Sequence, residues 1–228
     1  MPTSELIPST RRWAGVSPAD RRSQRRRLLV DAGLELMGTK GLDAMTVRAV
    51  LATARLNPRY FYESFGDVDE LAVAVYDRVV EDLSAVVLEV LDGSHGDPAL
   101  QARSVISSVV DFVDSDRRRG RVLYVEGLGN EALNRRRLET SKAVAAFIET
   151  YAAARQPAAV AHDEVTRVGT SILIGGFSQL LMDWLQGRVK LSRERLVRDA
   201  TELFLAMGDA AAELAYRGHS PAKARSAR

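Results

Sequence analysis

The segment TVRAVLATARLNPRYFYESF, residues 46–65, constrains the fold more than any other part of this chain. Thr46 can accept a hydrogen bond from an unpaired amide in the first turn of a helix, and Asn57 followed by Pro58 is a favourable helix start. Two helices of about two turns each are therefore expected, joined by residues 55–56. Helices this short are unstable alone in water, so they must pack against longer neighbours. The arrangement predicts a helix-turn-helix unit.

Four aromatic residues crowd into the second of these short helices. At about 100° per residue, Phe61 and Phe65 fall on one face, where they are expected to pack against the helices before and after. Tyr62 and Arg59 fall on the opposite side, and Tyr60 lies on the flank. An outward tyrosine hydroxyl can donate to a phosphate, and an arginine can donate two bonds to a guanine edge. The alternative is that both tyrosines are half-buried packing residues.

The rest of the chain has the apolar spacing of helices, and no segment alternates with a period of two, which predicts an all-α fold. Helices are expected at residues 21–40, 68–91, 98–115, 121–128, 130–154, 161–187 and 192–216. Breakers such as DRRRG at 116–120 separate them. The expected division is a mostly disordered basic arm, a helix-turn-helix domain, a helical C-terminal domain and a disordered tail, at residues 1–20, 21–70, 71–216 and 217–228.

Positive charge is concentrated near the N-terminus. Residues 1–65 carry eleven Lys and Arg against six Asp and Glu, whereas residues 66–216 carry seventeen against twenty-four. Seven of the arginines lie between residues 11 and 27. A basic first third on an acidic body favours a polyanionic partner for that third alone, although an ordinary solvated surface is the alternative.

The composition argues against several classes of protein. The chain has no cysteine, which excludes disulfide frameworks, thiol catalysis and cysteine-bound metals and fits a reducing cytoplasm. The N-terminus lacks a signal-peptide pattern. No uninterrupted apolar window of about 18 residues occurs, so we expect no membrane partner.

The sequence also lacks the motifs of an enzyme. His95, His162 and His219 lie apart, and none has a partner at metal-ligand spacing. The stretch GLGNEA at 127–132 matches a dinucleotide-binding pattern, but no strand precedes it, so we interpret it as a helix break. We therefore expect no catalytic residue, no metal and no cofactor.

Three features of the N-terminal part occur together in a known family. The first helix ends at KG, the second opens with TVR, and the third contains FYESF followed by an acidic cap and EL. Over about residues 23–80 the chain resembles the DNA-binding domain of TetR-type, or tetracycline-repressor-like, transcriptional regulators. The resemblance implies an all-helical homodimer with an N-terminal three-helix, helix-turn-helix DNA-binding domain and a C-terminal helical domain for effector binding and dimerisation.

The resemblance also implies a mode of action. Such a protein works in the bacterial cytoplasm at the nucleoid, binds a near-palindromic double-stranded DNA operator and releases it when a small-molecule effector binds. Repression is the usual mode of the family. On the matching positions, the implied DNA contacts are Thr46, Arg48, Asn57, Arg59, Tyr60 and Tyr62. Arg25 and Arg26, with the rest of the arginine-rich arm, would lie along the backbone or minor groove.

The recognition segment, residues 57–65, departs from the common family pattern at Glu63 and Ser64, and the helix after it departs at Val68. Val68 stands where a lysine often contacts phosphate, so no phosphate contact is expected from this position. Glu63 can accept a hydrogen bond from a cytosine amino group, point to solvent, or pair with Arg59 four residues earlier.

Two faces of the helix expected at 161–187 suggest roles for the C-terminal domain. One face, with the last helix, would form a four-helix dimer interface from Gly169, Leu173, Gly176, Leu180, Leu203 and Met207. The opposite face would line an effector pocket with residues of neighbouring helices: Phe112, Tyr124, Phe147, Tyr151, Ile174, Phe177, Ser178 and Leu181. For both sets, ordinary packing within the chain is the alternative.

A second hypothesis keeps the helical fold and changes the partner. The chain would then be a cytoplasmic protein whose basic N-terminal arm binds RNA or acidic membrane surfaces, and the helix-turn-helix would only be a packing unit. A heparin-like polyanion would compete equally with any DNA sequence in that case.

Overall fold

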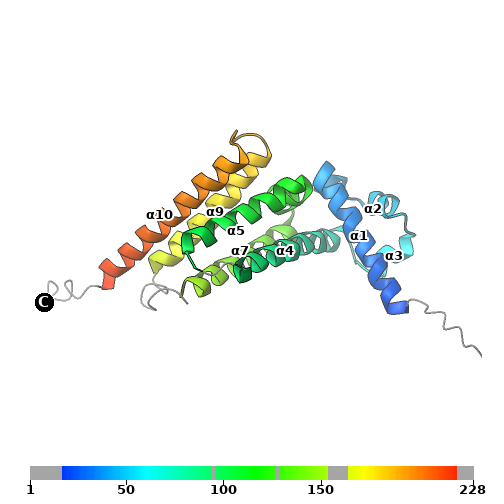
Figure 1. Ribbon diagram of the computed structural model, residues 1–228. Coiled ribbons are helices and arrows are strands. Elements are labelled where there is room, and N and C mark those ends of the chain that lie inside the picture. Colours follow the sequence, from blue (N-terminus) through cyan, green and yellow to red (C-terminus); the bar gives the residue numbers. More distant parts are fainter. Residues whose placement is uncertain (1–16, 94–95, 127–128, 154–163, 220–228) are drawn as a thin grey trace, which may run out of the picture.

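The computed structural model describes residues 17–93, 96–126, 129–153 and 164–219, and all regular elements within them are helical, as predicted. A small N-terminal domain lies at one end of an elongated bundle, far from the C-terminal end of α10 (Figure 1). The domain contains α1 (Pro18–Lys40), η1 (Leu42–Ala44), α2 (Val47–Ala54) and α3 (Pro58–Tyr62). The bundle contains α4 (Val68–Gly93), α5 (Pro98–Ser115), α6 (Arg117–Gly120), η2 (Arg121–Val125), α7 (Glu131–Ala153), α9 (Glu164–Leu185) and α10 (Arg193–His219).

The first helix begins earlier than predicted. The Ser17 hydroxyl accepts from the Asp20 amide at 3.0 Å, and the Asp20 carboxylate accepts from the Ser17 amide at 3.3 Å. This capping box, with Pro18 in the first turn, starts α1 inside the segment expected to be a disordered arm. The predicted arm is therefore wrong for residues 17–20, and its residues 1–16 lie outside the described part of the chain.

Two other predicted boundaries are corrected. The DRRRG segment forms α6 instead of a break, because the Asp116 side chain accepts from the Arg118 amide at 3.1 Å and caps the helix. The π-helical turn η2 follows α6 directly, where a longer helix was expected. The helix α10 runs to His219, three residues into the predicted tail, whose residues 220–228 are not among those described.

The caps of the two short helices differ from each other. The Thr46 hydroxyl accepts from the Ala49 amide at 3.2 Å, as predicted. Asn57 occupies the N-cap position of α3, but its side chain makes no capping hydrogen bond, contrary to expectation. Arg55 closes the turn between the helices in a left-handed conformation, with φ 54° and ψ 43°. The five-residue α3 is thus held by packing more than by its own backbone.

Two aromatic rings supply that packing. Phe61 and Phe65 are 0% and 2% exposed, and their ring centroids lie 6.0 Å apart, as the helical wheel predicts. Val50 of α2 and Leu29 of α1 are fully buried in the same core. The helix-turn-helix therefore rests on α1 through an apolar core.

The helix α4 links the two parts of the molecule. It packs against α1 at one end and against α5 and α7 in the bundle (Figure 1). Its buried residues follow helical spacing: Leu71, Ala72, Val75, Tyr76 and Val79. The predicted domain boundary between residues 70 and 71 falls inside the first turn of this helix.

The end of α1 meets α6 and η2 at what we call the domain joint, formed by Glu35, Gly38, Thr39 and Leu42 on one side and Arg118, Arg121 and Glu126 on the other. Arg118 pairs with Glu35 at 2.6 Å, and Arg121 donates to the Thr39 carbonyl at 3.0 Å. The Glu126 carboxylate accepts from the Leu42 amide at 2.8 Å and pairs with Arg121 at 2.6 Å.

The helix α9 carries uncovered apolar surface. Among the described residues, α9 is the helix with the length and mean hydropathy of a membrane span. Only 17% of its apolar window is buried. The prediction of no such segment considered only uninterrupted apolar runs. Mostly buried core helices pass the same test, whereas most of the α9 window is not buried; α9 packs against α7 and α10. Its exposed residues include Val168 and Ile172, which are 58% and 56% exposed.

Candidate nucleic-acid interface and cavity

The predicted DNA-binding residues lie on α1, α2, α3 and their caps. Most are exposed to solvent: Arg26, Thr46, Arg48, Asn57, Arg59 and Tyr62. Tyr62 is 64% exposed, which agrees with its predicted outward position. Arg25 and Tyr60 are only partly exposed. The Tyr60 side chain is therefore half-buried, as in the alternative in which the tyrosines are packing residues.

Arginines of α1 cover the aromatic rings of the recognition segment. The Arg25 guanidinium lies 4.4 Å from the Tyr60 ring centroid, and that of Arg26 lies 4.8 Å from the Phe65 centroid. A guanidinium over an aromatic face is attracted by the negative charge of the ring face. The two contacts position basic groups of α1 beside α3, so the two helices present one basic surface.

Glu63 lies within this basic surface. Its carboxylate pairs with Arg59 at 2.6 Å, which is one of the arrangements expected from the sequence, and with Arg25 at 3.6 Å. Its backbone carbonyl accepts from Arg22 at 2.7 Å. The hydrogen bond that Arg59 donates to the Glu63 carboxylate raises the pKa of Arg59 above its ordinary value. One carboxylate thus partly neutralises two of the arginines proposed to contact DNA.

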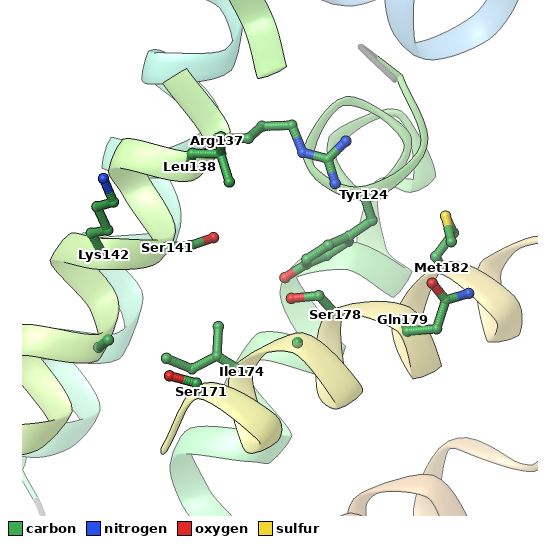
Figure 2. Close-up of a pocket in the computed structure, with 12 residues that line it drawn as sticks. Tyr124, Arg137, Leu138, Ser141, Lys142, Ser171, Ile174, Ser178, Gln179 and Met182 are labelled. Atoms are coloured by element: carbon green, nitrogen blue, oxygen red, sulfur yellow. The ribbon is translucent and has the colours of Figure 1, made fainter. Parts of the chain in front are cut away.

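A cavity of about 450 Å³ opens between α7, α9 and η2 (Figure 2). Three of the predicted pocket residues line it: Tyr124, Ile174 and Ser178. Its other lining residues are Arg137, Leu138, Ser141, Lys142, Ala145, Ser171, Gly175, Gln179 and Met182. In the described part of the chain, no group of three or more His, Asp or Glu could hold a metal ion.

The other predicted pocket residues lie elsewhere. Phe112 is buried with the Arg119 guanidinium 4.6 Å from its ring centroid, and Leu181 is fully buried in the core. Phe177 packs edge-on against Phe204 of α10, with ring centroids 5.4 Å apart. Phe177 and Leu181 miss the cavity because they lie about 60–100° around the helix from Ser178 on one side, whereas the lining residues Gly175 and Gln179 lie on the other side.

The last two predicted pocket residues form a pair of their own on α7. Phe147 and Tyr151 stack with centroids 6.1 Å apart, and neither lines the cavity. They are farther along the helix than Ala145, the last α7 residue of the lining. The helical wheel identified an inward face but not the length of helix that borders the open space.

Tyr124 and Arg137 connect the cavity with the domain joint. Burial raises the pKa of Tyr124 above its ordinary value, and the nearby Arg137 charge opposes this rise. Arg137 donates to the backbone carbonyl of Glu126 at 3.3 Å. Glu126 ends η2, the turn that carries Tyr124, and its side chain holds Leu42. Sequence reasoning missed Arg137 and Glu126, because no local pattern marks either residue.

The geometry of the N-terminal domain agrees with the comparison to known proteins. Residues 29–75 match the family model described as bacterial regulatory proteins, tetR family. The predicted resemblance to the TetR family is confirmed. The match runs from α1 into α4 and contains the whole helix-turn-helix. No curated protein matches the chain significantly.

Solved structures share the TetR-type fold over most of the chain. A putative TetR-family transcriptional regulator from Syntrophomonas wolfei has a TM-score of 0.70 at 10% identity, over 82% of this chain and 96% of that one. A tetR-family regulator from Streptomyces coelicolor has a TM-score of 0.68 at 18% identity, over 84% and 83%. The regulator FadR from Bacillus subtilis, in complex with stearoyl-CoA, has 0.64 at 14% identity, over 78% and 96%.

Within this TetR-type fold, the predicted dimer residues fall into two groups. Gly169 is buried, with Ala211 of α10 beside it, and Leu180 packs against the core, so both make contacts within the chain. Leu203 is 66% exposed, and nothing lies within 4 Å of the position that a Cβ of Gly176 would take. Leu173 and Met207 are partly exposed.

Proposed function

We propose that the chain is a homodimeric, ligand-responsive transcriptional repressor of the bacterial cytoplasm. It binds a palindromic DNA operator through α2 and α3 and releases it when a small molecule occupies the cavity between α7, α9 and η2. The observation that carries this proposal is a TetR-type helix-turn-helix in which residues 58–65 bury Phe61 and Phe65 and leave Arg59 and Tyr62 in solvent.

The exposed apolar side chains of α9 and α10 support the dimer. Val168, Ile172, Leu203 and Leu214 are each more than half exposed in the single chain. Apolar surface of this kind usually marks an interface in a soluble protein. A symmetric pairing of the two helices with their copies would cover these side chains. Two recognition helices would then lie on one DNA face, about 34–36 Å apart in successive major grooves.

Selection of bound DNA from a random pool tests the proposal. The expected product is one enriched near-palindromic site, protected as two half-sites, with two chains bound. Heparin should compete far better with random DNA than with the selected site. Equal competition against every sequence would favour the second hypothesis, in which the basic arm binds polyanions without sequence preference.

Two substitutions on the exposed face of α3 test the residues that are proposed to contact DNA. Arg59→Ala and Tyr62→Phe are each expected to weaken binding to the selected operator by about tenfold, because one arginine–base or tyrosine–phosphate contact is lost. Neither should change thermal unfolding, since both side chains are exposed. Fluorescence anisotropy with a labelled operator measures the effect. Wild-type affinity in both variants would show that another helix reads the DNA.

Substitution of Glu63 tests the role of the carboxylate within the basic surface. Glu63→Gln is expected to tighten binding to random DNA and to steepen its salt dependence by about one phosphate equivalent, near 0.9 in logarithmic slope. The reason is that Arg59 and Arg25 lose their intramolecular partner. Binding isotherms at several salt concentrations give the slope. Glu70→Gln, at a carboxylate that accepts instead from the Gly66 amide, is the matched control and should leave the slope unchanged.

A further inference from the structure

We propose that the cavity between α7, α9 and η2 binds a small organic anion with an apolar body, and that Arg137 holds its charged head. The proposal deepens the proposed function and rests on it only in naming the cavity as the effector site. The cavity volume of about 450 Å³ lies within the usual range of about 300–1,000 Å³ for small-molecule sites.

The charges of the lining have one sign. Among the described residues, Arg137 and Lys142 are the charged side chains that border the cavity, and neither Asp nor Glu is among its lining residues. Arg137 lies on a helix whose preceding arginines are paired: Arg135 with Glu131 at 3.8 Å, and Arg136 with Asp77 at 2.6 Å. Within the described residues, Arg137 has no ion pair. A partly buried guanidinium without a carboxylate favours an anionic ligand.

The remaining lining combines hydroxyl groups with apolar side chains. Figure 2 shows Arg137, Tyr124 and Ser178, which come from α7, η2 and α9, among the side chains that line the cavity. Hydroxyl groups can donate to the oxygens of a carboxylate or phosphate. The apolar part of the lining comes from Leu138, Ala145, Ile174 and Met182. An anionic head with an apolar body fits both kinds of surface.

A second cavity, of about 530 Å³ at the domain joint, lacks this property. Its lining carries charges of both signs, since Asp43, Asp69 and Glu126 accompany Lys40 and Arg121. Arg121 pairs with Glu126 at 2.6 Å, and Asn130 donates to Asp69 at 2.7 Å. A ligand there would have to break these contacts. The unpaired arginine therefore distinguishes the cavity on α7 and α9.

The same arginine connects ligand binding to the DNA-binding domain. Arg137 donates to the Glu126 carbonyl, and the Glu126 carboxylate holds the Leu42 amide. An anion that takes the donors of Arg137 competes with this carbonyl. Occupation of the cavity would then loosen the end of η2 and the domain joint, which changes the relative stability of two arrangements of the dimer.

Calorimetric titration of the full chain with matched eight-carbon probes tests the ligand class. Octanoate and octyl phosphate share a tail but differ in head group, octanol is neutral, and octylamine is cationic. At least one anion is expected to bind about tenfold or more tightly than octanol, and octylamine not to bind. The stronger of the two anions identifies the head group as carboxylate or phosphate.

Variants locate the head group. Arg137→Gln should weaken anion binding by about tenfold or more and leave octanol binding unchanged, whereas Arg135→Gln, on the same helix, should bind like wild type. If Arg137→Gln does not fold, Lys142→Gln gives a second measurement at another basic residue of the lining. Its loss of anion affinity is expected to be smaller. Equal binding of octanol and both anions, or full anion affinity in the glutamine variants, would overturn the proposal.

These titrations contain no DNA, so they separate the two proposals. Anion binding that depends on Arg137 in a chain that selects no operator would support the ligand class and refute the regulator. Operator binding in a chain that prefers octanol would support the regulator and refute the anionic ligand class. In the regulator, the bound anion should weaken the operator complex of the wild type and leave that of Arg137→Gln unchanged.

Discussion

Phe61→Ala is expected to lower the free energy of unfolding by about 3–5 kcal/mol, the usual cost of removing a buried phenylalanine side chain. Phe61 is 0% exposed and contacts both Phe65 and Tyr62 through its ring. The five residues of α3 cannot keep a helix without this anchor. DNA binding should therefore be lost together with stability, as urea denaturation and operator anisotropy would show.

Tyr62→Ala is the matched control for this prediction. Tyr62 neighbours Phe61 on the same helix but is 64% exposed, so its removal should cost less than about 1 kcal/mol. This variant should lose operator affinity while keeping its fold. If Phe61→Ala unfolded at the same urea concentration as Tyr62→Ala, Phe61 would not be the anchor of α3.

Gly38→Ala is expected to destabilise the protein by about 1–3 kcal/mol through overpacking. A Cβ at this position would contact Arg118 of α6, reaching its Cβ and lying 2.8 Å from its Cα. Because the obstacle includes backbone, a side-chain rotation cannot relieve the contact. The domain joint must open, which separates Arg118 from Glu35 and Arg121 from the Thr39 carbonyl.

The expected destabilisation is opposite in sign to the usual effect of replacing a helical glycine by alanine. An alanine is usually favoured over a glycine within a helix by about 1 kcal/mol. Gly93 ends α4, and nothing lies within 4 Å of the position that its Cβ would take, so Gly93→Ala should be neutral or stabilising. Thermal unfolding of both variants gives the comparison. A stabilised Gly38→Ala protein would show that α1 and α6 do not approach closely in solution.

The helix-turn-helix was predictable because its signals are local. The wheel placed Phe61 and Phe65 inside from their spacing alone, and Thr46 lies where its cap is needed. The start of α1 was missed although Ser17 and Asp20 have the spacing of a capping box. Pro2, Pro8 and Pro18 suggested disorder over residues 1–20, but Pro18 lies in the first turn of α1, where a proline costs nothing.

The cavity and the domain joint were not predictable in the same way. The contacts of Arg118, Arg121 and Glu126 with the end of α1 and with η1 join residues 82 to 84 positions apart, and no sequence period predicts such pairs. Periodicity showed that α9 has an inward face at Ile174 and Ser178. It could not show which neighbours leave space beside that face, because the space depends on the positions of three separate elements.

The carboxylate of Glu63 has a consequence for the time that a regulator spends on wrong sites. A genome offers about 10⁶–10⁹ competing positions, and a protein held tightly at each would search slowly. Because Glu63 already occupies Arg59 and Arg25, a phosphate gains these arginines only by displacing it. In the proposed regulator, this exchange would add little free energy on random DNA, so that complex would dissociate early. On the operator, base contacts would add to the exchange, and the complex would last longer there.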